Sequence, residues 1–278
     1  MNEAVLTYRP GVNSVADTAL KAAAALWLAV AITGQLIFVL YIAAFYGGLA
    51  ARGDLLTWNK VLPHGYVAGN TIGNAVLAGH LLFAAGITFS GVLQLIPQIR
   101  ARFTVFHRWN GRIYVATAFI MGVTGLYLTS SGRTLVGDVT QHVAIEINAI
   151  LIMVCAARAW CSAVARDFLA HRRWALRLFL VVSGVWFFRV GLMFWLVLNQ
   201  GPVGFDPQTF KGPFLTCLAF GQYLLPLAGL EIYLRTKERG GVTGKFAAAG
   251  GLFVLTFATG VGIFAATLGM WLPQARLR

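Results

Sequence analysis

Long apolar segments alternate with short polar connections along almost the whole chain. Seven segments reach the length of about twenty residues that a helix needs to cross a bilayer. They cover residues 19–46, 71–97, 110–130, 141–163, 175–199, 213–234 and 246–271. Backbone polar groups inside lipid must be satisfied within the segment, so runs of this length are expected to be helices. The pattern predicts an all-α integral membrane bundle of about seven transmembrane helices.

The composition agrees with this class. Of 278 residues, 58% are hydrophobic and only 11% are charged, and the mean hydropathy is +0.73. A soluble domain cannot enclose so much apolar surface in one water-facing shell. We therefore expect residues 1–278 to form a single membrane domain. Residues 71–199 are expected to be its core four-helix unit, with 19–46, 213–234 and 246–271 as peripheral spans.

The basic residues collect in alternate connections and indicate an orientation. Three connections are rich in basic residues. In chain order they contain Arg100, Arg102, Arg108 and Arg112; Arg158, Arg166, Arg172, Arg173 and Arg177; and Arg235, Lys237, Arg239 and Lys245. The other connections contain only Arg52, Lys60, Arg133 and Lys211. By the positive-inside rule the rich group faces the cytoplasm, and so does the N-terminus. The net charge of +13 thus reflects topology. Since no basic stripe or stacking motif accompanies it, a nucleic-acid partner is not expected.

Four histidines fall on four consecutive apolar segments and alternate between their two ends: His80, His107, His142 and His171. Ionisable side chains in lipid are costly, so each one is a candidate functional residue. If the segments form two similar hairpins, His80 faces His142 near the outer side and His107 faces His171 near the inner side. Two facing imidazoles can bind one haem iron. The pattern favours two haem b groups at two depths, with these histidines as iron ligands.

The two inner turns are similar in sequence. Aligning Trp109 with Trp174 also aligns Arg112 with Arg177, although His107 then misses His171 by one position. A weak internal repeat is one interpretation. The other is that any cytoplasmic turn collects arginine and an interfacial tryptophan. In that interpretation both histidines are interfacial side chains that reach water or headgroups.

Other polar residues lie within or beside the apolar segments. Glu146 and Arg189 are expected to meet as an ion pair in a protein-lined cavity, or Arg189 holds a haem propionate. Glu231 and Arg235 are four residues apart, which predicts a pair at a helix end. At the inner side, arginines are expected to hold propionates of the second haem or to receive an anionic electron donor. These are Arg108, Arg112, Arg172, Arg173 and Arg177.

The stretch from His80 to about Trp195 resembles a family of bacterial predicted membrane proteins, the domain of unknown function numbered 2306. The resemblance rests on HRWNGRIY from His107 to Tyr114, on HRRWALRLF from His171 to Phe179, and on Gln94 and Arg189. It covers somewhat under half of the chain and implies a membrane fold without an activity. With the charge pattern, it implies a multi-pass protein of the bacterial inner membrane whose N-terminus is cytoplasmic.

A second resemblance concerns layout alone. Ascorbate-reducible di-haem b-type transmembrane cytochromes carry one histidine on each of four consecutive helices and pair the first with the third and the second with the fourth. The order of the four histidines here is similar, although His107 and His171 lie at the membrane edge. Such a likeness is an analogy and not a function.

Three functional hypotheses follow, and the sequence leaves open whether the protein is an enzyme. The first is a haem electron carrier, a membrane oxidoreductase that exchanges electrons with a quinone or another small molecule. The second is a transporter without haem, or an assembly subunit that docks partners in a larger membrane complex. The third is a metalloenzyme in which His80, His142 and Glu146 form a two-histidine, one-carboxylate metal site.

Overall fold

The computed structural model describes residues 11–132 and 137–276, so the predicted outer-side Arg133 lies outside the described residues. Within this part the chain is helical, and a single isolated bridge joins Asp206 and Lys211. The elements are α1 (Val12–Ile42), η1 (Ala43–Gly47), α2 (Gly48–Ala51), η2 (Leu56–Lys60), α3 (Thr71–Leu95), α4 (Pro97–Arg102), α5 (Thr104–Ser130), α6 (Val139–Val164), α7 (Phe168–Val182), α8 (Gly184–Asn199), α9 (Pro213–Arg239), α10 (Val242–Ala266), η3 (Thr267–Trp271) and α11 (Leu272–Ala275).

Six helical stretches are long and apolar enough to cross a membrane by themselves. The helices α7 and α8 meet the same criterion only as a pair bent by 55°, which gives six or seven candidate spans in the described part of the chain. The predicted membrane bundle is thus confirmed, and the chain is an integral membrane protein. The first and last spans are longer than the apolar runs suggested, because continuous helix covers residues 12–51 and 242–275.

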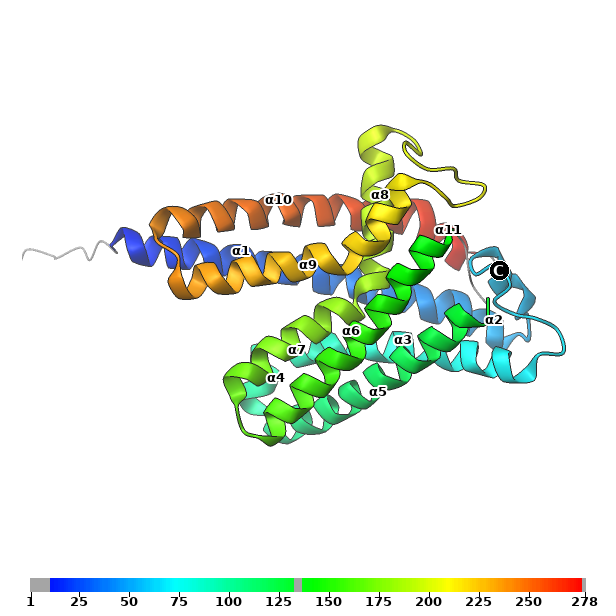
Figure 1. The fold of residues 1–278 in the computed structure, drawn as a ribbon, viewed down its shortest axis with the longest axis horizontal. Coiled ribbons are helices and arrows are strands. Elements are labelled where there is room, and N and C mark those ends of the chain that lie inside the picture. The colour runs from blue at the N-terminus through cyan, green and yellow to red at the C-terminus, as the bar shows by residue number, and fades with distance from the viewer. Residues whose placement is uncertain (1–10, 133–136, 277–278) are drawn as a thin grey trace, which may run out of the picture.

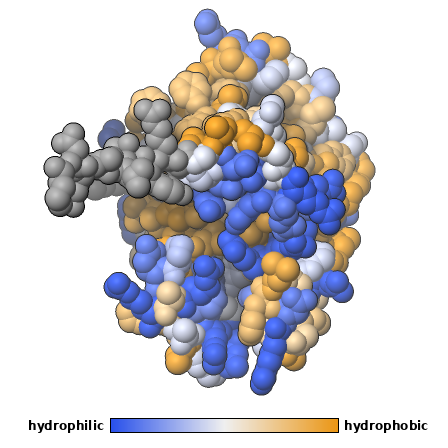
Figure 2. Space-filling model, turned by 90° about the vertical axis from the view of Figure 1, so that its left-hand side faces the viewer, coloured by the Kyte–Doolittle hydropathy of each residue, from blue (hydrophilic) through white to orange (hydrophobic). Residues whose placement is uncertain are grey.

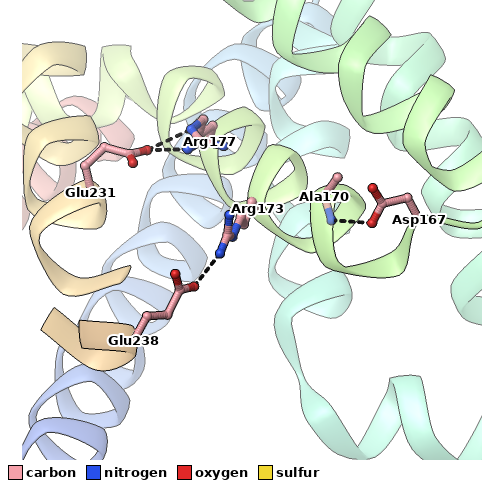
Figure 3. Close-up of polar contacts among 6 residues, drawn as sticks. All are labelled: Asp167, Ala170, Arg173, Arg177, Glu231 and Glu238. Carbon is pink, nitrogen blue, oxygen red and sulfur yellow. Dashed lines mark hydrogen bonds and ion pairs between the residues drawn. The ribbon is translucent and has the colours of Figure 1, made fainter. Parts of the chain in front are cut away.

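Polar residues start several of these helices. Asn70, Asp138 and Asp167 each accept a hydrogen bond from a backbone N–H in the first turn of α3, α6 and α7. The Asp167 Oδ1 accepts a hydrogen bond from the backbone N–H of Ala170, with 3.0 Å between the oxygen and the nitrogen (Figure 3). The first N–H groups of a helix have no intrahelical acceptor, so these side chains satisfy them and fix where each helix begins.

The helices form two groups that α8 connects. Figure 1 shows α1 and α10 running alongside each other with α9 near them, and α3, α5, α6 and α7 gathered in a bundle below. The bend between α7 and α8 sends α8 out of the bundle, where it packs against α9 and α10. The second half of this span therefore meets different neighbours from the first half.

Each group has its own apolar core. The bundle core contains Ile87, Tyr114, Cys155 and Leu178 of α3, α5, α6 and α7, and Tyr223 packs into it from α9, which contacts both groups. The other core is rich in aromatic residues and lies where α1 meets α10 and η3; its rings include Phe38, Tyr41, Phe45, Tyr46, Trp58, Trp186 and Trp271. Large rings bury much area per residue, so this second core fixes the end of α1 firmly.

The basic connections lie together at one end of the molecule. The turns from α3 to α5, from α6 to α7 and from α9 to α10 lie there beside the start of α1 (Figure 1). Figure 2 looks onto this end and shows hydrophilic residues gathered on it, with hydrophobic residues around them. We call it the basic end and call the other the opposite end.

Candidate functional site

The four histidines occupy related positions in their helices. His107, His142 and His171 are each the fourth residue of α5, α6 and α7, whereas His80 is the tenth residue of α3. His107 and His171 therefore lie near the basic end, and His80 and His142 lie toward the opposite end. The alternation follows from the up-and-down course of the chain.

The hydrogen bond of His80 defines its tautomer. Its Nδ1 lies 2.8 Å from the Oγ1 of Thr124 on α5. That hydroxyl donates its own hydrogen to the carbonyl of Ile120 at 2.7 Å. The hydroxyl thus acts as acceptor toward His80, so Nδ1 carries the proton and Nε2 keeps a lone pair.

The same reasoning applies to His171. Its Nδ1 lies 2.9 Å from the carbonyl oxygen of Ala159 on α6. A carbonyl only accepts, so Nδ1 donates and Nε2 keeps its lone pair. In His107 the Nδ1 atom is buried and has no hydrogen-bond partner among the described residues. His107 and His171 are both the fourth residue of their helices, α5 and α7, and both of these helices start at the basic end.

The histidine pair at the opposite end is less evenly matched. His80 follows the first residue of α3 by nine positions, or roughly 14 Å of rise, while His142 lies in the first turn of α6. The imidazole of His80 packs beside Gly125, since a Cβ there would stand 3.8 Å from the His80 Cε1. Of the two pairs, the one at the basic end has the better matched helical positions.

The non-haem metal site is not formed. Across residues 11–132 and 137–276, no three His, Cys, Asp or Glu side chains come together in a way that could hold a metal ion. The predicted site of His80, His142 and Glu146 is therefore wrong. A haem iron takes only two axial side chains, so this result concerns the metalloenzyme hypothesis alone.

The predicted pair of Glu146 and Arg189 is also wrong. In the described part of the chain the ion pairs are Arg173–Glu238, Arg177–Glu231 and Lys245–Asp17. The guanidinium carbon of Arg189 instead lies 5.5 Å from the ring centre of Phe38 on α1. The physical reason is the bend before α8, which directs this helix away from α6 and toward α1 and α10.

The two similar turns make the same tryptophan–arginine contact. Arg112 lies 4.7 Å from the ring centre of Trp109, and Arg177 lies 4.8 Å from that of Trp174. Both are cation–π pairs three residues apart on one helical face. The weak repeat in the sequence thus has a structural counterpart.

Gln94 and Asn110, part of the same sequence region, tie α3 to α5. Gln94 Nε2 donates to the His107 carbonyl at 3.1 Å. Asn110 Nδ2 donates to the Ser90 carbonyl at 3.2 Å, and the Ser90 hydroxyl donates back to Asn110 Oδ1 at 2.9 Å. These bonds fix the start of α5, and with it the position of His107.

A cavity of about 420 Å³ lies between α7 and α9 at the basic end. Glu231 accepts from Arg177 Nε at 2.8 Å and Nη2 at 2.5 Å, and Glu238 pairs with Arg173 (Figure 3). Glu231 therefore reaches across to α7, and the predicted pair within α9 with Arg235 is wrong. The helices α7 and α9 lie close enough for Glu231 to reach Arg177. The spacing of residues within one helix does not predict a bond between two helices.

A buried polar cluster surrounds the break between α7 and α8, and the sequence reasoning missed it. Gln35, Asn148, Ser183 and Gln222 are 1%, 7%, 8% and 5% exposed. Gln35 Nε2 donates to Ser183 Oγ at 2.8 Å, and Asn148 Nδ2 donates to the Val181 carbonyl at 3.2 Å. The oxygens Gln35 Oε1 and Asn148 Oδ1 are buried without a partner among the described residues. The usable signal was a Ser-Gly pair within an apolar run, since such pairs are common sites of kinks.

Comparison with known proteins adds a family to this geometry. Residues 77–210 match DUF2306, a family described as a predicted membrane protein. The DUF2306 match confirms the resemblance noted in the sequence, and its span contains His80, His107, His142 and His171 together with the α7–α8 break. It assigns no cofactor, and the likeness to di-haem cytochromes is not shown. No curated protein and no solved structure matches the chain.

Proposed function

We propose that this membrane protein is a b-type haem electron carrier. The ligands at the basic end are His107 and His171, and those toward the opposite end are His80 and His142. The observation that supports the proposal is the hydrogen bonding of His80 and His171, whose Nδ1–H groups have fixed acceptors. Metal-binding histidines commonly donate their other ring N–H in this way, which orients the ring and leaves Nε2 for the metal.

The residues at the basic end fit the donor set that a haem needs. His107 and His171 each stand in the first turn of a helix that starts at the basic end, and the Nδ1 of His171 is held by the Ala159 carbonyl. Haem propionates are carboxylates, which pair well with planar guanidinium groups. Arg108, Arg112 and Arg172 form no ion pair within the described residues and are available for them, whereas Arg177 is engaged by Glu231. Arg189, the sequence-based candidate toward the opposite end, lies over the Phe38 ring instead.

The chain's own groups would set the conditions for electron transfer. A bound haem iron supplies one-electron redox chemistry. The Nδ1 hydrogen bonds of His80 and His171 would orient two of the rings, and arginines would pair with the propionates. The bundle core of the same helices is apolar and includes the buried residues Ile87, Tyr114 and Leu178. In such a buried, low-dielectric environment, each nearby charged side chain has a larger effect on the reduction potential of the haem iron. A quinone or another small molecule would act as electron donor or acceptor.

The test is the visible spectrum of protein purified in detergent from haem-replete cells. We expect sharp α and β bands after dithionite reduction in the wild type, with reduced intensity in His107→Ala and in His171→Ala. His64→Asn is the matched control, because His64 lies in a connection at a positive φ of 56°, which Asn tolerates. Size-exclusion profiles identify variants that failed to fold. A colourless wild type, or full pigment in both helix variants, overturns the proposal.

Transport of a small cation is a second candidate, and a different observation favours it. Discontinuous spans with free oxygen acceptors at the break are typical of cation sites in transporters. Here the break at Ser183 is surrounded by buried amide oxygens of Gln35 and Asn148 that have no partner among the described residues. The thermal stability of the purified protein in sodium chloride and in choline chloride tests this. Stabilisation by sodium that Asn148→Leu abolishes supports transport, and equal stability in both salts refutes it.

A further inference from the structure

The cavity between α7 and α9 has a surplus of positive charge. Its charged lining consists of Arg173, Arg177, Arg235, Arg239, Glu231 and Glu238. Each glutamate is already paired with an arginine of α7. Among the described residues no carboxylate pairs with Arg235 or Arg239, so two guanidinium groups have no counter-charge. An anion entering this cavity would meet arginines that the chain does not neutralise.

The cavity wall on α7 is organised before any ligand arrives. Arg177 is held on one side by Glu231 at 2.5 Å and stacks over Trp174 at 4.8 Å. Figure 3 shows Arg173 and Arg177 extending from α7 toward the glutamates of α9. The Arg173 Nε is buried and has no partner among the described residues, so one N–H donor stays unsatisfied beside the cavity. The guanidinium groups of this wall are thus positioned before an anion binds.

This cavity is separate from the histidines. Arg173 follows His171 by two residues, and side chains two apart on a helix do not share a face. His171 is directed to the Ala159 carbonyl on α6, and Arg173 is directed to Glu238 on α9. Anion binding in this cavity is therefore independent of haem binding.

We propose that the cavity binds a phosphate-bearing anion, with Arg235 and Arg239 as its main charged contacts. Guanidinium groups match phosphate oxygens with paired hydrogen bonds, and the volume of 420 Å³ lies within the range of about 300–1,000 Å³ usual for small-ligand pockets. The site lies at the ends of two membrane spans, where basic pockets between helices bind anionic headgroups. The phosphate comes either from such a lipid or from a soluble compound.

Single variants on α9 give a matched test. Arg235→Ala and Arg239→Ala each remove one positive charge from the cavity. Lys237→Ala removes the same charge from the same helix but not from the cavity, because Lys237 lies over the Tyr233 ring and is not part of the lining. Glu231→Gln and Glu238→Gln each release an arginine for the ligand. Affinity should fall about tenfold in each arginine variant, change less than about twofold in Lys237→Ala, and rise in the glutamine variants.

Two measurements separate the sources of phosphate. Native mass spectrometry compares retention of phosphatidylglycerol with that of phosphatidylcholine, and thermal stability is titrated with sodium pyrophosphate against sodium chloride at equal ionic strength. Selective retention of phosphatidylglycerol assigns a lipid headgroup, and selective stabilisation by pyrophosphate assigns a soluble ligand. The proposal is overturned if neither probe is preferred. It is also overturned if Lys237→Ala weakens binding as much as the arginine variants, because the effect is then diffuse charge.

Discussion

The close approach of α8 and α10 gives a quantitative prediction for Gly262→Ala. A Cβ on Gly262 would collide with the carbonyl oxygen of Val190 and stand 2.7 Å from its Cγ1. A backbone carbonyl cannot rotate away, so the two helices must separate. Overpacking of this kind costs about 1–3 kcal/mol, and the better helix propensity of alanine returns up to about 1 kcal/mol. We expect a net destabilisation of about 1–2 kcal/mol.

Gly250→Ala on the same helix is the matched control. No atom lies within 4 Å of a Cβ at Gly250, so the change in helix propensity acts alone. This variant should be unchanged or up to about 1 kcal/mol more stable. Unfolding in detergent, followed by tryptophan fluorescence, measures both. Equal stabilities of the two variants would refute the α8–α10 contact, and with it the bend that carries Arg189 toward α1.

Further predictions concern single polar contacts. Ser183→Ala leaves the Gln35 amide without its acceptor and should cost about 1–3 kcal/mol, whereas the double variant with Gln35→Leu should recover most of this in the same unfolding assay. Glu231→Gln removes a partly exposed ion pair with α7 and should lower stability by less than about 1 kcal/mol. The pKa of Asp206 is held below its ordinary value, chiefly by the backbone N–H of Gln208, so its contribution is present above the unfolded pKa and is lost as pH falls through the lower folded pKa. The protection factor of the Gln208 amide, which corrects for the intrinsic pH dependence of hydrogen exchange, should fall in that acidic range and show no such step in Asp206→Asn.

The spans were predictable because they depend on local properties. Apolar length alone locates a membrane helix, and the capping residues Asn70, Asp138 and Asp167 mark helix starts in the sequence. The alternation of the histidines between the two ends follows from the same count of spans. These features need no knowledge of which helices are neighbours.

Contacts between helices were not predictable in this way. The hydropathy of the run 175–199 is that of a single span, and the Ser183–Gly184 pair marks a possible kink without giving the 55° bend or its direction. Once α8 turns, Arg189 meets Phe38 and cannot meet Glu146. Glu231 likewise has a partner four residues away in sequence, yet a nearer one on α7. In each case the deciding quantity is the direction of a helix, which tertiary packing sets.

The most direct test of the proposed function is the number of haem groups per chain, measured by pyridine haemochrome assay on protein from haem-replete cells. The account predicts two b-type haem groups per wild-type chain. When His107 and His171 are both replaced by alanine, in a variant that still elutes as a folded species, the haem at the basic end should be lost. A wild type without haem, or a double variant that keeps every haem, would contradict it.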